Sequence, residues 1–209
     1  MPAYLERLLQ LVFPDRCAAC RQVGQLLCTR CCATLQGYPQ HVSIAGVDQV
    51  WIAHLFDDRL RAAIHQLKYR GARRAAQPLG ALLAAQLAGH ALHGAVLVPV
   101  PLHPERQRTR GYNQAALLAH AVAARTGLTV EERHLVRSRS TAQQARLDAR
   151  ARRSNMAGAF VWTGSAAPPA HAIIVDDVLT TGATVEAVAA ALWAAGTQRV
   201  TALALARSA

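Results

Sequence analysis

The sequence has little of several residue types. Among its 209 residues it has one lysine, Lys68, and 12 acidic side chains, so its arginines leave a formal net charge of +11. Aromatic residues make up 5% of the chain, which leaves few platforms for stacking nucleobases. Because 52% of the residues are hydrophobic, a disordered chain is excluded. The charge favours an anionic partner, which is a nucleic acid, an anionic membrane surface or a phosphorylated small molecule.

No apolar run is long enough to cross a membrane. In residues 75–104 the only ionisable side chains are three histidines, but the stretch divides into a helix-like half and a β-branched strand that runs into prolines. Neither half reaches the ~20 apolar residues that a spanning helix needs. The N-terminal segment lacks the basic region and the cleavage site of a secretion signal. We therefore expect no membrane insertion and a cytoplasmic, reducing location.

All five cysteines lie within residues 17–32, as two Cys-x2-Cys pairs separated by seven residues and followed by one more cysteine. The four cysteines of the pairs are Cys17, Cys20, Cys28 and Cys31. Two such turns can direct four thiolates at one Zn²⁺ ion without a large core, and four thiolates leave no open position for chemistry. We predict a structural zinc site, with Cys32 as a spare thiol or a competitor of Cys31. The alternative is a set of unligated or disulfide-bonded cysteines.

The rest of the chain alternates between strand and helix periodicity. The expected strands are residues 50–56, 95–101, 128–131, 159–162, 172–178 and 199–206, and the expected helices are residues 57–69, 79–92, 114–125 and 184–195. This alternation is typical of an α/β fold with a mostly parallel sheet flanked by helices. We predict two parts: an N-terminal helix and four-cysteine zinc ribbon in residues 1–40, and the α/β domain in residues 45–209.

Residues 173–184 carry the strongest functional signal. A buried apolar strand is expected to end in two adjacent carboxylates, Asp176 and Asp177, before a loop of hydroxyls and a glycine that opens onto a helix. Such a loop can bind a phosphate through the free amides of the helix start, through its hydroxyls and through a tight turn at the glycine. The predicted phosphate-binding residues are Thr180, Thr181, Gly182, Ala183 and Thr184. The carboxylates would repel a phosphate, so we assign them to vicinal sugar hydroxyls, directly or through Mg²⁺.

Two other interpretations of this loop fit the sequence less well. The loop lacks both the GxxxxGK[ST] and the GxGxxG patterns, so neither a P-loop nucleotide nor a dinucleotide is indicated. An N-capped helix that follows a strand with solvated aspartates would explain the composition of the loop. It would not explain why carboxylates, hydroxyls and glycine are concentrated at one strand end.

The segment VDDVLTTGAT resembles the phosphoribosyl pyrophosphate (PRPP) loop of the type I phosphoribosyltransferases. Within that family the resemblance is greatest to the ComF group, the competence-protein F and GntX-like proteins, and it extends over nearly the whole chain. The other matching segments are LVFPDRCAAC, CTRCC, LKYRG, VPVPLHPERQRTRGYNQAALLA and TAQQARLDARARRSNMAGAF. The resemblance implies the Rossmann-like type I phosphoribosyltransferase fold. It also implies that the acidic pair binds the ribose 2′ and 3′ hydroxyls and that the Thr/Gly loop holds the 5′-phosphate.

The resemblance implies further site residues. Lys68 and Gly71 would lie in the pyrophosphate loop, although a solvated lysine at a helix end is the alternative for Lys68. Arg106, Arg108 and Arg110 would lie in a flexible loop that closes over the pyrophosphate. The implied reaction is departure of pyrophosphate from Mg²⁺-PRPP and attack of a nucleophile on C1′. The implied catalytic residues are Asp176, Asp177, Lys68 and Arg110. No residue indicates the acceptor, so turnover is left open.

A second anionic partner is suggested by residues 105–153, which contain 11 arginines and four acidic residues. Single-stranded DNA would fit a groove of arginines, and ComF-like proteins are associated with uptake of transforming DNA. The expected DNA contacts are Arg106, Arg108, Arg110, Arg146 and Arg150, and the expected partners include competence or helicase machinery. An arginine-rich solvated surface is the alternative. Two functions therefore stay open: a PRPP-dependent transferase, and a non-catalytic DNA-binding accessory that uses the fold for ligand sensing or scaffolding.

Overall fold

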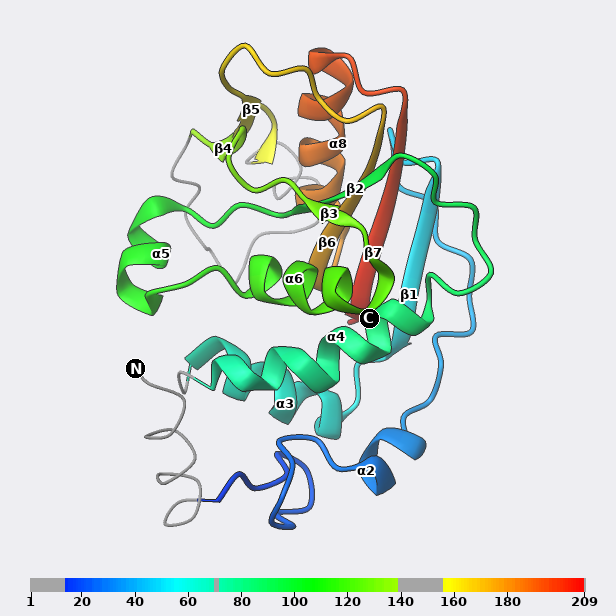
Figure 1. Ribbon diagram of the computed structural model, residues 1–209, viewed down its shortest axis with the longest axis vertical. Helices are drawn as coiled ribbons and strands as arrows, with labels where there is room; N and C mark the ends of the chain where they lie inside the picture. The colour runs from blue at the N-terminus through cyan, green and yellow to red at the C-terminus, as the bar shows by residue number, and fades with distance from the viewer. Residues whose placement is uncertain (1–13, 70–71, 139–155, 209) are drawn as a thin grey trace.

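The computed structural model describes residues 14–69, 72–138 and 156–208 (Figure 1). A five-stranded sheet lies at the centre, in the order β1-β7-β6-β2-β3, and each neighbouring pair is parallel. The strands are β1 (Gln49–Leu55), β2 (Ala95–Pro99), β3 (Thr129–Val130), β6 (His171–Leu179) and β7 (Arg199–Arg207). The predicted α/β fold with a mostly parallel sheet is therefore confirmed.

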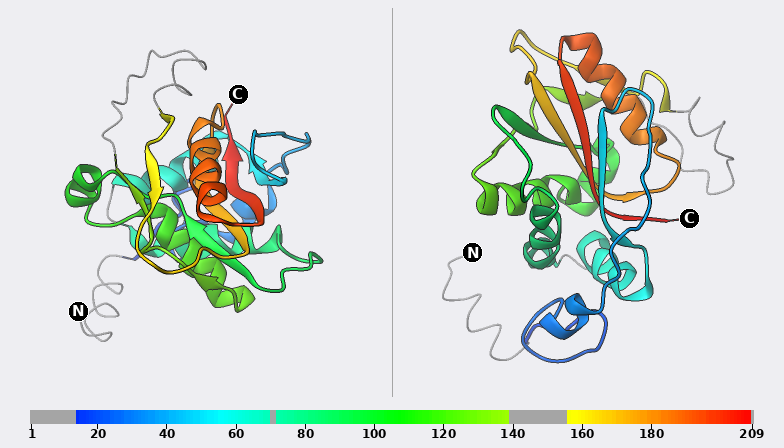
Figure 2. Two further views of the ribbon diagram at one scale, coloured as in Figure 1. Left: turned by 90° about the horizontal axis from the view of Figure 1, so that it is seen from above. Right: turned by 90° about the vertical axis from the view of Figure 1, so that its right-hand side faces the viewer.

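Helices cover both faces of the sheet (Figures 1 and 2). Helices α3 (Asp58–Tyr69), α4 (Ala76–Ala85) and α6 (Gln114–Thr126) lie on one face, and α8 (Ala183–Ala195) lies on the other. Two further helices, α2 (Thr29–Ala33) and α5 (Pro104–Arg110), lie away from the sheet, and a short 3₁₀ turn is formed by Arg73–Ala75. Alternate residues of β6 supply the two faces. Ile173 packs in one hydrophobic cluster with α3, α4 and α6, and Ile174 packs in the other cluster with α8.

The packing of α4 on α6 depends on a glycine. A Cβ atom at Gly80 would lie 2.4 Å from the Cβ of Ala121, a separation that real side chains do not reach. The two helices can therefore approach closely because Gly80 has no side chain. This helix pair supports the same sheet face as α3, so it helps to fix the position of the residues at the end of α3.

Three elements differ from the sequence-based expectations. Helix α4 begins at Ala76 and ends at Ala85, earlier at both ends than the predicted helix of residues 79–92. It can begin before Pro78 because proline fits in a first helical turn. The unpredicted strand β4 (Leu135–Arg137) pairs antiparallel with β5 (Phe160–Trp162) as a separate two-stranded sheet. Helix α5 occupies residues that were expected to form a loop.

The reason that α5 is a helix lies at its two ends. Pro104 stands at the first helical position, and the Nδ1 atom of His103 accepts a hydrogen bond from the backbone N–H of Glu105 at 3.4 Å. Gly111 ends the helix in the left-handed region, with φ of 77°. Proline at the start and glycine at the end are ordinary helix boundaries. Pro104 and Gly111, on either side of the segment expected to be a flexible loop, are thus the start and stop signals of a short helix.

The cysteine segment lies against α3 (Figure 2). Cys17, Leu27 and Cys28 are buried in the same hydrophobic cluster as Leu60 and Leu67 of α3. The division of the chain into residues 1–40 and 45–209 stays a prediction, and the predicted N-terminal helix falls outside the described residues. Among the described residues, none of the helices combines the length and apolar character that crossing a membrane requires.

Candidate functional site

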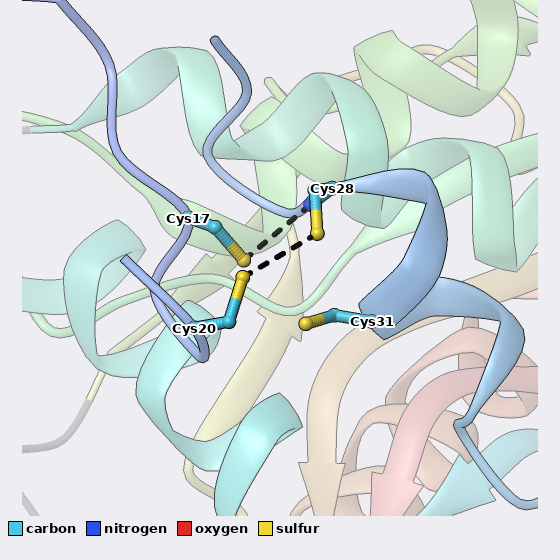
Figure 3. Close-up of side chains that lie close together, drawn as sticks. All are labelled: Cys17, Cys20, Cys28 and Cys31. Atoms are coloured by element: carbon cyan, nitrogen blue, oxygen red, sulfur yellow. Dashed lines mark hydrogen bonds between the residues drawn. The ribbon is translucent and has the colours of Figure 1, made fainter. Parts of the chain in front are cut away.

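The four predicted zinc ligands lie together in the structure (Figure 3). The Sγ atoms of Cys17, Cys20, Cys28 and Cys31 all lie within 4.8 Å of one another. The Sγ atoms of Cys20 and Cys28 are 3.6 Å apart, close to the ~3.8 Å expected between two thiolates that bind one tetrahedral Zn²⁺. Cys32 lies outside this group, with its Sγ 3.9 Å from the carbonyl oxygen of Leu27. The cluster could therefore hold a zinc ion with Cys31, and not Cys32, as its fourth ligand.

The thiols of this cluster differ in how easily they carry a negative charge. Burial opposes the charge on Cys17, but hydrogen bonds from the backbone N–H groups of Cys20 and Cys28 help to lower the pKa of its thiol to about 6. Burial, and then the neighbouring thiols, raise the pKa of Cys31 to about 12. Four thiolates cannot share so small a volume without a cation between them. The donor set therefore fits Zn²⁺, which binds such thiolates directly.

The acidic pair lies near the carboxyl end of strand β6. The strand continues through Asp176 and Asp177 to Leu179, one residue beyond the predicted strand of residues 172–178. The strand continues because it stays paired with β7, where Val178 lies opposite Ala206. Successive side chains of a strand point to opposite faces. The two carboxylates are therefore in different surroundings.

Asp177 forms an ion pair with the only lysine of the chain. Its Oδ2 atom lies 2.8 Å from Nζ of Lys68, and the side chains are 5% and 23% exposed. Among the described residues, none donates a hydrogen bond of ordinary geometry to this oxygen. The charge of Lys68 is thus the main compensation for burial of the Asp177 carboxylate. The fold brings together two residues that the sequence assigned to one site although they lie far apart in the chain.

Asp176 is half-buried beside this ion pair. Its Oδ1 atom accepts a hydrogen bond from the backbone N–H of Asp177 at 2.8 Å. Burial, and then the charge of Asp177, raise the pKa of Asp176 to about 7, although Lys68 and this hydrogen bond act in the opposite direction. Asp177 is held in the ion pair with Lys68, so Asp176 is the member of the pair whose carboxylate is better placed to bind a ligand.

The hydroxyl loop connects β6 to the start of α8. Gly182 precedes the helix with φ of 81°, in the region that favours glycine. A Cβ atom at this position would also lie 3.1 Å from Cδ1 of Ile44. The N–H groups of the first turn of α8 have no preceding helical carbonyl, and the Thr181 hydroxyl lies 3.4 Å from the Ala183 N–H. The loop thus presents amides and hydroxyls at a helix start, an arrangement suited to an anion.

A cavity of about 310 Å³ lies beside this loop. It is lined by Ser43, Ile44, Ala45, Thr181 and Glu186. Of the predicted loop residues, Thr180 is exposed and Thr184 is half-buried. The segment around Ile44 was not predicted to be part of the site because it carries no motif. It is found there only because the fold places it over Gly182.

A second cavity, of about 650 Å³, lies between the end of α3 and α5. It is lined by Lys68, Tyr69, Leu102, Glu105, Arg106, Thr109, Arg110, Tyr112 and Gln114. Three cations therefore face it against one acidic residue. The guanidinium of Arg110 lies 5.1 Å from the ring centre of Tyr69, and its Nη1 donates to Oε1 of Gln114 at 2.6 Å.

The structure brings together part of the predicted set of arginines. Arg106 and Arg110 line the larger cavity with Lys68. Arg108 is exposed on α5 and is not among the residues that line it. Gly71, Arg146 and Arg150 lie outside the described residues. The flexible loop expected at Arg106 is a helix, so any closure over a ligand would have to move α5 as a whole.

The fold and this arrangement define the class of the protein. The chain has a parallel sheet with an acidic pair and a Thr-Gly loop on its central strand, as the predicted type I phosphoribosyltransferase fold requires, and a four-cysteine segment packs against it. The chain belongs to the ComF/GntX-like family, which includes DNA utilization protein YhgH and competence protein F.

This membership rests on a relative that is similar over most of both chains. The DNA utilization protein YhgH of Salmonella typhi is 33% identical over 187 residues, which cover 84% of this chain and 78% of that protein. Competence protein F of Haemophilus influenzae is 34% identical over 114 residues, 54% of this chain and 50% of that protein. No family model matches the chain. Among solved structures, TT1426 of Thermus thermophilus has a TM-score of 0.37 and 19% identity, and the match covers 62% of this chain and 71% of TT1426.

Proposed function

We propose that this protein binds Mg²⁺-PRPP at the carboxyl end of β6 and acts in the use of DNA that the cell takes up. One observation carries the first part. Strand β6 carries the acidic pair, whose Asp177 lies 2.8 Å from Lys68 in the wall of the cationic cavity, and the chain continues from this strand into the Thr-Gly loop at the start of α8. PRPP has a phosphate at one end, a diol in the middle and a pyrophosphate at the other end. A loop of amides and hydroxyls, an acidic pair and a group of cations would suit these three parts of the ligand.

The chemistry can be divided among the residues accordingly. The amides of Ala183 and Thr184, with the Thr181 hydroxyl, would hold the 5′-phosphate. Asp176 would accept hydrogen bonds from the ribose hydroxyls. Lys68 and Arg110 would bind the pyrophosphate and stabilise the negative charge that grows on it as the bond to C1′ breaks. Asp177 would act indirectly, since its carboxylate is already paired with Lys68 at 2.8 Å.

Magnesium fits the oxygen donors of this region. Mg²⁺ prefers carboxylate and phosphate oxygens and keeps several of its waters, and Asp176 is a half-buried carboxylate whose charge is destabilised by burial and by Asp177. Asp176 would hold the ion together with the oxygens of PRPP. When bound, Mg²⁺ would neutralise part of the charge of the pyrophosphate leaving group.

Calorimetric titration with PRPP and MgCl₂ tests the binding site. We expect saturable binding to the unaltered protein and at least a tenfold weaker affinity for Asp176→Asn, which keeps the shape of the side chain and removes its charge. Asp58→Asn is the matched control, because the Asp58 side chain is 93% exposed and lines neither cavity of the candidate site. The proposal fails if the unaltered protein gives no response or if the two variants bind PRPP equally. Release of pyrophosphate from PRPP with a panel of nucleobases then decides whether the protein turns over.

The proposed role in DNA use comes from the relatives, which are named DNA utilization protein and competence protein F. One observation on this chain favours a second candidate, a DNA-binding accessory without turnover. Helix α5 exposes Arg108, and Arg106 and Arg110 are only half-buried. Arginines on a protein surface can bind the backbone of single-stranded DNA with a strong salt dependence.

Filter binding of single-stranded DNA at a series of salt concentrations tests this candidate. Arg108→Ala should reduce the affinity and the salt slope, while Arg59→Ala, an exposed arginine on α3, serves as control. A flat salt dependence, or equal retention of both variants, excludes DNA binding by α5. Binding of DNA without release of pyrophosphate from PRPP would favour the accessory over the transferase.

A further inference from the structure

Tyr112 makes a contact whose role the sequence did not reveal. It follows the glycine that ends α5, and its side chain is buried, with 8% of the residue exposed. Its hydroxyl donates a hydrogen bond to the backbone carbonyl oxygen of Leu67 in α3. Leu67 is the residue directly before Lys68. Tyr112 thus connects the end of α5 to the backbone that carries the lysine.

The carbonyl that accepts this bond needs a partner from outside its own helix. Helix α3 ends at Tyr69, so the carbonyl of Leu67 belongs to the last four of the helix, which have no N–H group further along the helix to bind. Leu67 is fully buried, and a buried carbonyl without a partner destabilises its surroundings. The Tyr112 hydroxyl therefore fixes the last turn of α3 at the point where Lys68 leaves it.

A second contact holds the tyrosine itself. The guanidinium of Arg73 lies over the Tyr112 ring, 4.9 Å from its centre, and Nη2 of Arg73 donates to the carbonyl oxygen of Gly111 at 3.0 Å. The predicted pyrophosphate loop contains Lys68 and Gly71, and Arg73 comes after this loop in the sequence. Tyr112 therefore contacts Leu67 and Arg73, one on each side of that loop.

We propose that Tyr112 is a positioning residue for Lys68, which it holds against Asp177 through the backbone of Leu67. The consequence for the ligand rests on the proposed binding of PRPP. A lysine that is fixed before the ligand arrives loses less conformational freedom on binding pyrophosphate than a mobile one. Tyr112 lies in the cavity wall beside Lys68, yet its hydroxyl points to the protein backbone.

The single lysine makes the proposal measurable without PRPP. Because Lys68 is the only lysine, acylation of an ε-amino group by a small reagent reports on one residue. Peptide mass spectrometry measures its rate and separates it from acylation of the α-amino group and the cysteine thiols. An ammonium held in an ion pair reacts slowly, so Asp177→Asn should give the rate of a released Lys68. Tyr112→Phe removes one hydroxyl and should raise the rate about fivefold, the change that corresponds to loss of a hydrogen bond worth ~1 kcal/mol.

The matched control is Tyr38→Phe, which removes a tyrosine hydroxyl whose partner, Gln40, lies on the exposed surface. It should leave the acylation rate unchanged. Both variants are compared at a temperature well below unfolding, so that a loss of global stability does not raise the rate. The proposal is overturned if Tyr112→Phe reacts with the reagent at the rate of the unaltered protein, or if Tyr38→Phe accelerates the reaction equally.

A double-mutant cycle extends the test to the ligand. Tyr112→Phe should weaken PRPP binding about fivefold in the unaltered background, and should have no further effect in the Lys68→Met background. An undiminished effect in that background would mean that Tyr112 acts on the ligand by another route, which overturns the proposal. If the unaltered protein binds no PRPP, the proposed function fails, and the acylation rates still decide whether Tyr112 positions Lys68.

Discussion

The cysteine cluster and the β6 site are built in opposite ways. The cluster takes all of its four ligands from residues 17–31, two short turns that meet at one point. The β6 site takes Asp176 and its loop from one segment, Lys68 from a helix much earlier in the chain, and its arginines from α5. The first is defined by spacing along the chain. The second exists only after the sheet has formed.

We therefore expect the cysteine cluster and the β6 site to respond differently to mutation. The cluster has little apolar surface of its own and shares its core with α3, so loss of its metal should unfold it as a unit. The β6 site lies on a strand buried between two neighbours. Changes there should alter local electrostatics and leave the sheet intact. Four predictions test this contrast, in order of expected effect.

The largest effect is expected for the cysteine cluster. Cys31→Ser should release the metal and lower the free energy of unfolding by at least ~4 kcal/mol, because structural zinc binds with an apparent ~10–16 kcal/mol in small zinc-binding peptides. Cys32→Ser is the control and should keep one zinc per chain, since its sulfur lies outside the group of four. The measurements are metal content by mass spectrometry and denaturant unfolding. The assignment is wrong if both variants keep the metal, or if only Cys32→Ser loses it.

The same contrast explains what the sequence could predict. The four cysteine ligands and the loop of residues 180–184 were found because each lies in one short segment with a recognisable pattern. The mostly parallel sheet was predicted from the alternation of strand and helix periodicity. Placement of Lys68 in the site of the acidic pair came from the resemblance, and the 2.8 Å contact with Asp177 agrees with it. The functional roles of these residues stay predictions.

Other features could not be read from local patterns. Helix α5 has seven residues without an apolar face, so only its Pro104 start and Gly111 end could have marked it. The approach of Ile44 to Gly182 and the hydrogen bond from Tyr112 to Leu67 join distant segments through single contacts. No periodicity along the chain encodes such a contact, because it depends on how the helices pack on the sheet.

The second prediction concerns the ion pair in the β6 site. Lys68→Met should leave Asp177 buried without its partner and lower the free energy of unfolding by ~2–3 kcal/mol, somewhat less than for a fully buried pair because the lysine is partly exposed. Adding Asp177→Asn should recover most of this loss. Arg74→Met is the control, since it breaks an ion pair with Asp15 whose arginine is 49% exposed, and should change stability by less than ~1 kcal/mol. If Lys68→Met and Arg74→Met lowered the free energy of unfolding equally, the burial assigned to the ion pair of Lys68 and Asp177 would be wrong.

The third prediction tests the turn before α8. Gly182→Ala should destabilise the protein by ~2 kcal/mol, because a left-handed backbone costs a non-glycine residue ~1–2 kcal/mol and the new Cβ would also press on Ile44 at 3.1 Å. Gly89→Ala is matched to it, with φ of 80° and no atom within 4 Å of the new Cβ, so it should show the backbone effect alone. Thermal unfolding of the two variants measures the difference. A larger loss for Gly89→Ala would contradict the close contact between Ile44 and the loop.

The smallest effect, and the one that most separates the two regions, is expected for Asp176→Asn. The pKa of Asp176 rises from its ordinary 3.8 to about 7 on folding, so the folded state binds more protons than the unfolded state between these values. The stability that this group contributes therefore falls as the pH rises from about 4 to about 7, and the full penalty is present above pH 7. Asp176→Asn removes the cost of burying this charged carboxylate. Its effect on the free energy of unfolding of the ligand-free protein should therefore be more stabilising at pH 8 than at pH 4, by ~1–2 kcal/mol.

Urea unfolding of Asp176→Asn and the unaltered protein between pH 4 and 8 measures this difference, with Asp58→Asn as the exposed control. A difference that stays flat with pH, or that falls as the pH rises, would show that Asp176 is not held at a raised pKa. The cysteine variants lose stability when a ligand atom is removed, whereas this variant should gain it while losing affinity for PRPP. A residue that destabilises its own fold in the absence of ligand is best explained by what it binds.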